Sequence, residues 1–161
     1  MGSRQRKTTG MIGADAARII REFPLGIVAT VTVDGKPVAS PKGTFLLLDD
    51  MTIAYGDIRS PGTRANLMRN PMAEVVFVDP FRRKGVRITG STEIIEWESK
   101  RFNDLHTRWA EVWGELAKRI RALVLIHVDG VKPVTTPPYD DGVTEEEMTA
   151  LYKAKFGELY P

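Results

Sequence analysis

Residues 59–66, which read Arg-Ser-Pro-Gly-Thr-Arg-Ala-Asn, combine the features of an anion-binding helix start. Ser60 is a good N-cap and Pro61 suits the first helical position. The first turn of a helix carries unpaired backbone N–H groups and about half a positive charge, so it attracts anions. Hydroxyl, amide and guanidinium groups surround this turn, from Arg59, Ser60, Thr63, Arg64 and Asn66. An ordinary capped helix with solvated arginines explains the same residues, and both interpretations stay open.

A second segment, residues 40–44, interrupts a strand pattern with proline and glycine. Such an interruption is typical of a bulge, or of a backbone that lies close against a ligand. Lys42 stands in the middle of this segment and would bring a positive charge to that ligand. The alternative is an edge-strand bulge with a solvated Lys42, and these residues by themselves do not separate the two.

The elements that must position these two segments are mainly short strands. β-Branched residues fill residues 25–33, and Asp34-Gly35 then predicts a hairpin with a type I′ turn, which needs positive φ. Further strands are expected over residues 36–40, 43–48, 52–55, 73–78, 86–95 and 122–128. Helical spacing or capping predicts helices over residues 12–23, 60–70, 98–120 and 144–156. About six or seven short strands with hairpin links favour a barrel or a sandwich, and the inserted helices argue against an immunoglobulin-like sandwich.

Composition restricts the class of protein. The 161 residues suggest one domain, and 23 basic against 21 acidic residues give a net charge of +2, too balanced for a dedicated nucleic-acid binder. The sequence has no cysteine, and its two histidines cannot form a three-histidine metal site, so we expect no metal. No apolar run approaches the ~18 residues of a membrane span, and no secretory signal is recognisable, so we expect a cytoplasmic protein.

Nucleotide-loop and hydrolase motifs are also missing. The sequence has no G-x-G-x-x-G after a strand, no Walker A loop, no H-E-x-x-H and no G-x-S-x-G. A dinucleotide fold, a P-loop enzyme, a zincin and an α/β-hydrolase are therefore not expected. We expect residues 1–11 to form a disordered basic tail and residues 12–161 to form a single domain.

Taken in order, these features resemble the pyridoxamine 5′-phosphate oxidase family of FMN-binding split β-barrels. The resemblance covers about residues 12–128, and no single element of it is specific, whereas the ordered set is. That set consists of an apolar strand ending in Ala29-Thr30, the Asp34-Gly35 hairpin, a strand carrying Lys42, the segment from Tyr55 to Asn66, Asn70-Pro71, and a strand with Val86, Gly90 and Glu93.

The resemblance implies an α+β, mainly β fold: a six-stranded antiparallel split β-barrel with flanking helices. It implies a homodimer with one FMN in each of two clefts at the interface. It places the isoalloxazine ring along Ala39, Ser40, Pro41 and Lys42, with Tyr55, Gly56 and Asp57 nearby. It assigns the phosphate to Arg59, Ser60, Thr63, Arg64 and Asn66.

The activity implied is that of an oxidoreductase in which a hydride passes to or from FMN on a small substrate, with no side-chain acid or base assigned. The alternatives are a non-catalytic flavin-binding or redox-sensing module, or the same fold binding a deazaflavin or haem. Two departures from the family pattern matter. Gly62 stands where the family often has Lys or Arg. The chain ends YKAKFGELYP rather than in the family's R-L-x-P segment, so pyridoxamine 5′-phosphate itself is not the expected substrate.

Overall fold

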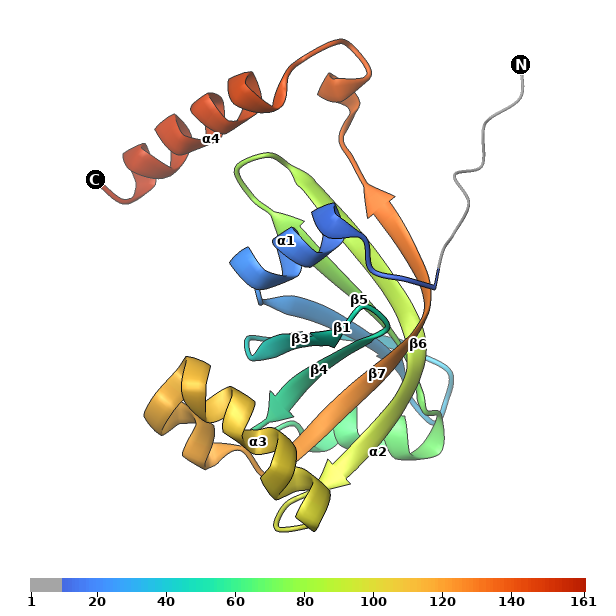
Figure 1. Cartoon of the computed structure of the whole chain (residues 1–161). Coiled ribbons are helices and arrows are strands. Elements are labelled where there is room, and N and C mark those ends of the chain that lie inside the picture. Colours follow the sequence, from blue (N-terminus) through green and yellow to red (C-terminus); the bar gives the residue numbers. More distant parts are fainter. Residues whose placement is uncertain (1–9) are drawn as a thin grey trace.

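A computed structural model describes residues 10–161, and its main feature is one antiparallel sheet that curves into a split β-barrel (Figure 1). The sheet has seven strands in the order β2-β1-β5-β6-β7-β4-β3. Their bounds are β1 (Gly26–Val31), β2 (Pro37–Lys42), β3 (Phe45–Asp49), β4 (Thr52–Asp57), β5 (Met72–Asp79), β6 (Lys84–Glu96) and β7 (Ala122–Val134). The mainly β split barrel is thus confirmed.

The sheet has seven strands, as the strand pattern of the sequence allowed, rather than the six that the resemblance implies, and the two strands expected over 36–40 and 43–48 form its two edges. β2 pairs with β1 at one edge of the sheet, and β3 pairs with β4 at the other. Gly43 and Thr44 connect them, outside either strand. The interruption seen in the sequence is therefore the point where the chain crosses from one sheet edge to the other, and the sheet does not close.

Four α-helices flank the sheet: α1 (Ala14–Glu22), α2 (Pro61–Arg69), α3 (Lys100–Trp113) and α4 (Glu145–Leu159). Two short 3₁₀ turns, η1 (Gly114–Arg119) and η2 (Pro137–Tyr139), complete the elements. The continuous helix expected over 98–120 is wrong. Gly114 has φ 51°, a left-handed conformation that ends α3 after Trp113.

Two hydrophobic clusters lie on opposite faces of the sheet, because successive side chains of a strand point to opposite sides. In β4, Ile53 and Tyr55 belong to the cluster that also contains residues of α1. Ala54 belongs to the second cluster, with Phe102 and Trp109 of α3. α3 therefore covers the outer face of β4 and β7, while α1 covers the other side.

The hairpin at Asp34-Gly35 is confirmed, but its predicted type I′ turn is wrong. Only Gly35 has a positive φ, 80°, whereas a type I′ turn needs positive φ at both central residues. The connection is longer than two residues: β1 ends at Val31, β2 begins at Pro37, and Thr32 N–H donates to the carbonyl of Lys36. The side chain of Asp34 also accepts from the Thr32 hydroxyl at 2.6 Å, which stabilises this wider turn.

The basic tail expected over residues 1–11 lies, up to residue 9, outside the described residues. Among residues 10–161, no helix is both long enough and apolar enough to cross a bilayer.

Candidate functional site

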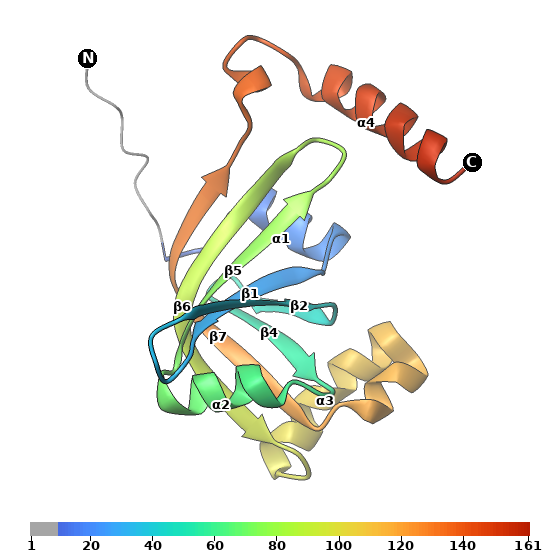
Figure 2. The same ribbon diagram turned by 180° about the vertical axis from the view of Figure 1, so that it is seen from behind.

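The structure brings together the two segments that the sequence singled out, through Lys42. Its Nζ donates to Ser40 Oγ at 2.8 Å and to Ser60 Oγ at 2.6 Å. Ser40 and Lys42 lie two residues apart on β2, hence on the same face of the strand. The end of β2 and the start of α2 therefore form one polar site (Figure 2 shows α2 alongside the strands that precede it).

The start of α2 has no side-chain cap. Ser60 occupies the N-cap position and Pro61 follows it, as predicted, but no side chain makes a capping hydrogen bond there. The capping role expected of the Ser60 hydroxyl is wrong, because this hydroxyl accepts from Lys42 instead. The N–H groups of the first turn, with the positive end of the helix dipole, are left for another acceptor.

Lys42 lies in an environment that opposes its charge. The residue is only 9% exposed. Burial lowers the pKa of the Lys42 ammonium below its ordinary value, and the nearby charge of Asp57 raises it in part. An anion beside Lys42 would favour the charged form further.

Asp57 ends β4 next to this lysine and is itself buried. Its Oδ1 atom has no hydrogen-bond partner among residues 10–161. A buried carboxylate oxygen without a donor is uncommon and needs an explanation. A ligand hydroxyl at this point would supply the missing donor.

The arginines of the predicted phosphate segment differ in their surroundings. Arg64, in the first turn of α2, forms an ion pair with Glu96 at the end of β6. Arg59 is exposed and makes no ion pair within the described part of the chain. Arg59 is therefore free to meet an incoming anion, whereas Arg64 already links α2 to β6.

Asn66 and Thr63 are the buried members of the same segment. Asn66 Nδ2 donates to Thr30 Oγ1 at 3.0 Å, and Arg69 donates to Asn66 Oδ1 at 2.8 Å. These bonds attach the middle of α2 to β1. The structure thus gives Asn66 a clear role in holding the helix in place.

Tyr55 and Gly56 are packed below the site rather than open to it. Tyr55 is 1% exposed, its ring centroid lies 5.2 Å from that of Phe45, and burial raises the pKa of its phenol. A Cβ atom at Gly56 would meet Ile120 Cδ1 at 2.4 Å, so any other residue there would force the Ile120 side chain to move. Both residues support the strand that carries Asp57.

Thr44 was missed by the sequence reasoning as a supporting residue. Its hydroxyl donates to the carbonyl of Gly56 at 2.8 Å and accepts from the Gly56 N–H at 3.0 Å. Its own carbonyl accepts from the indole N–H of Trp109 at 2.8 Å. The only signal in the sequence was its place directly after Gly43, in the interrupted strand.

The remaining predicted ring contacts, Ala39 and Pro41, lie on the other face of β2. They alternate with Ser40 and Lys42, and both are exposed. Within the predicted segment 39–42, Ser40 and Lys42 therefore lie on the polar face of β2 beside α2, whereas Ala39 and Pro41 lie on its opposite, exposed face.

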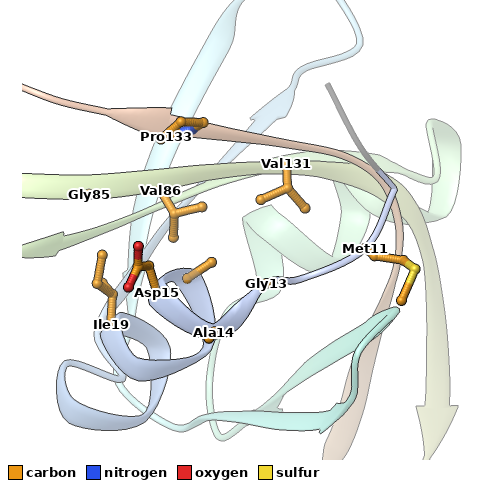
Figure 3. Close-up of a pocket in the computed structure, with 10 residues that line it drawn as sticks. Met11, Gly13, Ala14, Asp15, Ile19, Gly85, Val86, Val131 and Pro133 are labelled. Atoms are coloured by element: carbon orange, nitrogen blue, oxygen red, sulfur yellow. The ribbon is translucent and has the colours of Figure 1, made fainter. Parts of the chain in front are cut away.

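A separate cavity of about 480 Å³ lies between α1 and strands β6 and β7 (Figure 3). Its lining is mostly apolar and includes Ile19, Val86 and Val131, with Asp15 at one side. None of the predicted site residues lines this cavity.

Comparison with solved structures places this geometry among known proteins. HupZ of Group A Streptococcus is 30% identical; the match covers 78% of this chain and 96% of that one, with a TM-score of 0.67. An FMN-binding protein from Syntrophomonas wolfei is 15% identical, over 76% of this chain and 86% of that one, with a TM-score of 0.62. HutZ, the heme storage protein from Vibrio cholerae, is 17% identical, over 75% of this chain and 93% of that one, with a TM-score of 0.60. The last two likenesses show the fold alone.

A comparison with curated proteins found no match. The family profile described as pyridoxamine 5′-phosphate oxidase matches residues 12–136, which include every strand of the sheet and the whole of the site around Lys42. The chain therefore belongs to the pyridoxamine 5′-phosphate oxidase family.

Proposed function

We propose that this protein binds FMN through the site at Lys42 and the start of α2, and that it acts as an FMN-dependent oxidoreductase. The observation that carries the proposal is the side chain of Ser60. It occupies an N-cap position yet leaves the helix uncapped, because Lys42 holds its hydroxyl. A lysine, a hydroxyl and free helical N–H groups together form a site for a phosphate.

The residues of the site could bind the phosphate, the ribityl chain and the ring of FMN. Lys42, Ser60 and Thr63 with the first-turn N–H groups would hold the phosphate, and exposed Arg59 would add charge. Asp57 Oδ1, which lacks a donor, would accept from a hydroxyl of the ribityl chain. The flavin ring would extend along β2.

FMN supplies hydride chemistry when bound, and this chain would supply binding, orientation and exclusion of water. Lys42 would neutralise the phosphate and fix its position relative to β2. Thr44 and Trp109 would hold β4 and the crossing segment rigid behind the site. We assign no side-chain acid or base.

A homodimer belongs to the same proposal, because one face of the sheet exposes apolar side chains around the Glu74–Arg87 ion pair. Ile27 and Val31 of β1 are 39% and 40% exposed, and Met72 and Val78 of β5 are 42% and 45% exposed. The strand register places these side chains on one face with Ala39 and Pro41. A second subunit on this face would cover it and approach the ring-binding part of β2.

Light scattering tests the dimer. The protein should have about twice the 18.0 kDa mass of one chain. Val31→Lys should shift it towards a monomer, whereas Val33→Lys, in the adjacent turn and 80% exposed, should not. A wild-type monomer that still retains FMN would contradict this part of the proposal.

Haem in the same place is less well supported by the residues present. The two histidines are engaged elsewhere: His106 Nε2 lies 2.7 Å from the carbonyl of Ala117, and His127 Nε2 lies 3.1 Å from Glu93 Oε1. Among the hydrogen bonds and ion pairs of residues 10–161, neither histidine is paired with Lys42 or Ser60. A flavin store without turnover would use the same contacts as the oxidoreductase, and an assay for reductase activity separates these two.

The test of the proposed site compares FMN with riboflavin. The protein mixed with FMN and desalted should keep a flavin absorption spectrum, whereas riboflavin, which lacks the phosphate, should bind at least ~10-fold more weakly. Equal affinities would show that the site does not recognise phosphate. If the purified protein shows the absorption spectrum of haem or of a deazaflavin, that ligand, and not FMN, is the one that the protein binds.

A further inference from the structure

The tip of the β5–β6 hairpin carries three consecutive basic residues, and they differ in their partners. Lys84 Nζ lies 2.8 Å from Glu145 Oε1, and Arg82 Nε lies 3.5 Å from Glu145 Oε2, at the start of α4. Arg83 forms no ion pair within the described part of the chain. Its guanidinium carbon lies 4.6 Å from the centroid of the Tyr152 ring instead. Of the three charges, the one on Arg83 therefore remains without a carboxylate among residues 10–161.

The backbone of Arg83 is also unusual. Its φ is 56°, a left-handed conformation that is uncommon for a residue other than glycine and costs free energy. Glycine would adopt this conformation at the end of the turn without that cost. Strained positions of this kind are frequent at binding sites, where the side chain has a use that offsets the strain. The surroundings of the Arg83 side chain show what that use could be.

A cavity of about 400 Å³ lies beside Arg83, and we call it the α4 cavity. It is bounded by the segment that leads into α4 and by the first two turns of that helix, and both whole-chain views show α4 beyond the tip of the β5–β6 hairpin (Figures 1 and 2). Its volume is within the ~300–1,000 Å³ of small-molecule sites. Its apolar lining consists of Pro138, Val143, Met148, Leu151 and Tyr152.

Two further polar groups at the α4 cavity lack partners. Lys155 Nζ lies 5.2 Å from the centroid of the Tyr152 ring and forms no ion pair among residues 10–161. Thr136 lines the cavity, and its buried Oγ1 has no hydrogen-bond partner in the same part of the chain. A buried hydroxyl without a partner needs an explanation. The α4 cavity thus combines apolar walls with two cations that no carboxylate neutralises and with an unsatisfied hydroxyl.

We infer that the α4 cavity binds a small amphipathic carboxylate, of which a medium-chain fatty acid is the simplest example. The chain would lie on the apolar lining, and the carboxylate would lie on Arg83 and Lys155. A guanidinium binds a carboxylate through two parallel hydrogen bonds, and each buried CH₂ group adds affinity. The carboxylate that lines the cavity, Glu147, accepts from the Thr144 N–H at 2.8 Å in the capping box of α4. No residue of the α4 cavity belongs to the proposed flavin site, so the inference is independent of that site.

The first arm of the test titrates the whole protein with acetate, hexanoate, octanoate and octanol by calorimetry. Octanoate should bind, and affinity should rise by about 2- to 4-fold for each CH₂ group added between hexanoate and octanoate. Octanol, which has the same chain without the charge, should bind at least ~10-fold more weakly than octanoate, and acetate should show no binding.

The second arm removes the charge of Arg83. Asparagine tolerates the left-handed conformation, so Arg83→Asn should keep the turn and lower octanoate affinity by at least ~10-fold. Arg83→Gly, which relieves the strain, should have the same effect on binding. Arg119→Asn is the matched control, because Arg119 is an exposed arginine of η1, which follows α3 at the end of the molecule away from α4 (Figure 1). Circular-dichroism melts confirm that each variant folds.

The third arm changes the apolar lining. Leu151→Gln should weaken octanoate by about 5-fold, because Leu151 lines the cavity. Leu159→Gln, on the same helix, 69% exposed and outside the cavity lining, should leave the affinity within about 2-fold.

The inference is overturned if octanoate does not bind, if octanol binds equally well, or if Arg119→Asn weakens octanoate as much as Arg83→Asn does. A second copy of the chain in the cavity would also overturn it: Leu151→Gln would then lower the mass measured by light scattering, and octanoate would not bind. Failure of the proposed flavin site looks different, because the wild-type protein would then not retain FMN while octanoate still binds.

Discussion

The starts of helices α2 and α3 have the same residue type at the N-cap and use it in opposite ways. Ser99 accepts from the N–H of Phe102 at 3.1 Å and so caps α3. Ser60 makes no such bond at α2. The start of α4 is the most complete of the three, with a capping box in which Thr144 and Glu147 satisfy each other's N–H groups.

The difference between these starts lies in what surrounds each serine. The Ser99 hydroxyl is free to turn back to its own helix, whereas the Ser60 hydroxyl is held by Lys42, a neighbour 18 residues away in sequence. A missing cap costs about 1 kcal/mol of stability. The uncapped start of α2 lies beside a buried lysine, so a bound anion could accept from both the helical N–H groups and Lys42.

The largest effect is expected from Lys42→Met. It removes a buried ammonium that would make charge-assisted hydrogen bonds of ~1.5–3 kcal/mol each, so FMN affinity should fall by about 100-fold. The apoprotein should not lose stability, because burial disfavours this charge. Isothermal titration and thermal melting measure the two quantities. Lys132→Met, on an exposed part of β7, is the control, and equal FMN affinity in both variants would disprove the role of Lys42.

Replacing Gly62 with a charged residue should lower or raise FMN affinity according to the sign of the charge. This residue lies in the first turn of α2, and no atom lies within 4 Å of the position its Cβ would take, whereas Thr63 is buried. Gly62→Glu should lower FMN affinity by at least ~10-fold through repulsion, and Gly62→Lys should raise it. Gly62→Glu should stabilise the apoprotein by up to ~1 kcal/mol, because it removes a helical glycine and suits the positive end of the helix dipole, whereas Gly62→Lys should stabilise it less, because its charge opposes that dipole. Equal FMN affinities in the two variants would place the phosphate elsewhere.

The pH dependence should have opposite signs for binding and for stability. Above pH 7 the FMN phosphate is fully charged, so affinity should fall, by up to about 10-fold, as pH rises through the lowered pKa of Lys42. The same lowered pKa means that the unfolded chain binds the proton more tightly. The contribution of Lys42 to apoprotein stability should therefore rise between its folded pKa and its ordinary value. FMN titrations and thermal melts of wild type and Lys42→Met at pH 7–10 measure the contribution of Lys42 to FMN affinity and to apoprotein stability. If affinity and stability change with pH in the same way in both proteins, Lys42 is not the group responsible.

The smallest effects are expected from a matched pair of serine substitutions. Ser99→Ala removes a real cap and should cost about 1 kcal/mol of stability without changing FMN affinity. Ser60→Ala removes no cap but takes one hydrogen bond from the buried Lys42 ammonium, so any loss of apoprotein stability should disappear in a Lys42→Met background, and FMN should bind about 5-fold more weakly. Chemical denaturation and FMN titration of the single and double variants measure this. A stability loss at Ser60 that persists without Lys42, as the loss at Ser99 should, would mean that the two helix starts are alike.

Much of the fold was predictable because it depends on local patterns. The β-branched residues of 25–33 predicted the strand, which the structure has over Gly26–Val31. The pattern did not predict which face is buried: Val28 and Thr30 are buried, whereas the more apolar face with Ile27 and Val31 is exposed. Ser60, Pro61 and Asn70 correctly marked both ends of α2. The end of α3 at Gly114 was not predicted, because a glycine within apolar helical spacing leaves both continuation and termination possible.

The sequence by itself determined the mainly antiparallel β class, the helix that follows Ser60, and the ordered set of motifs that resembles the family. These properties depend on neighbours within a few residues, or on the order of such segments. Only the tertiary structure decided what Ser60, Ala39 and Asp57 do. The Ser60 hydroxyl faces Lys42, Ala39 lies on the face of β2 away from it, and Asp57 Oδ1 is buried without a donor. These outcomes follow from the crossing of residues 43–44 between sheet edges, which sets the partners of each side chain across long sequence distances.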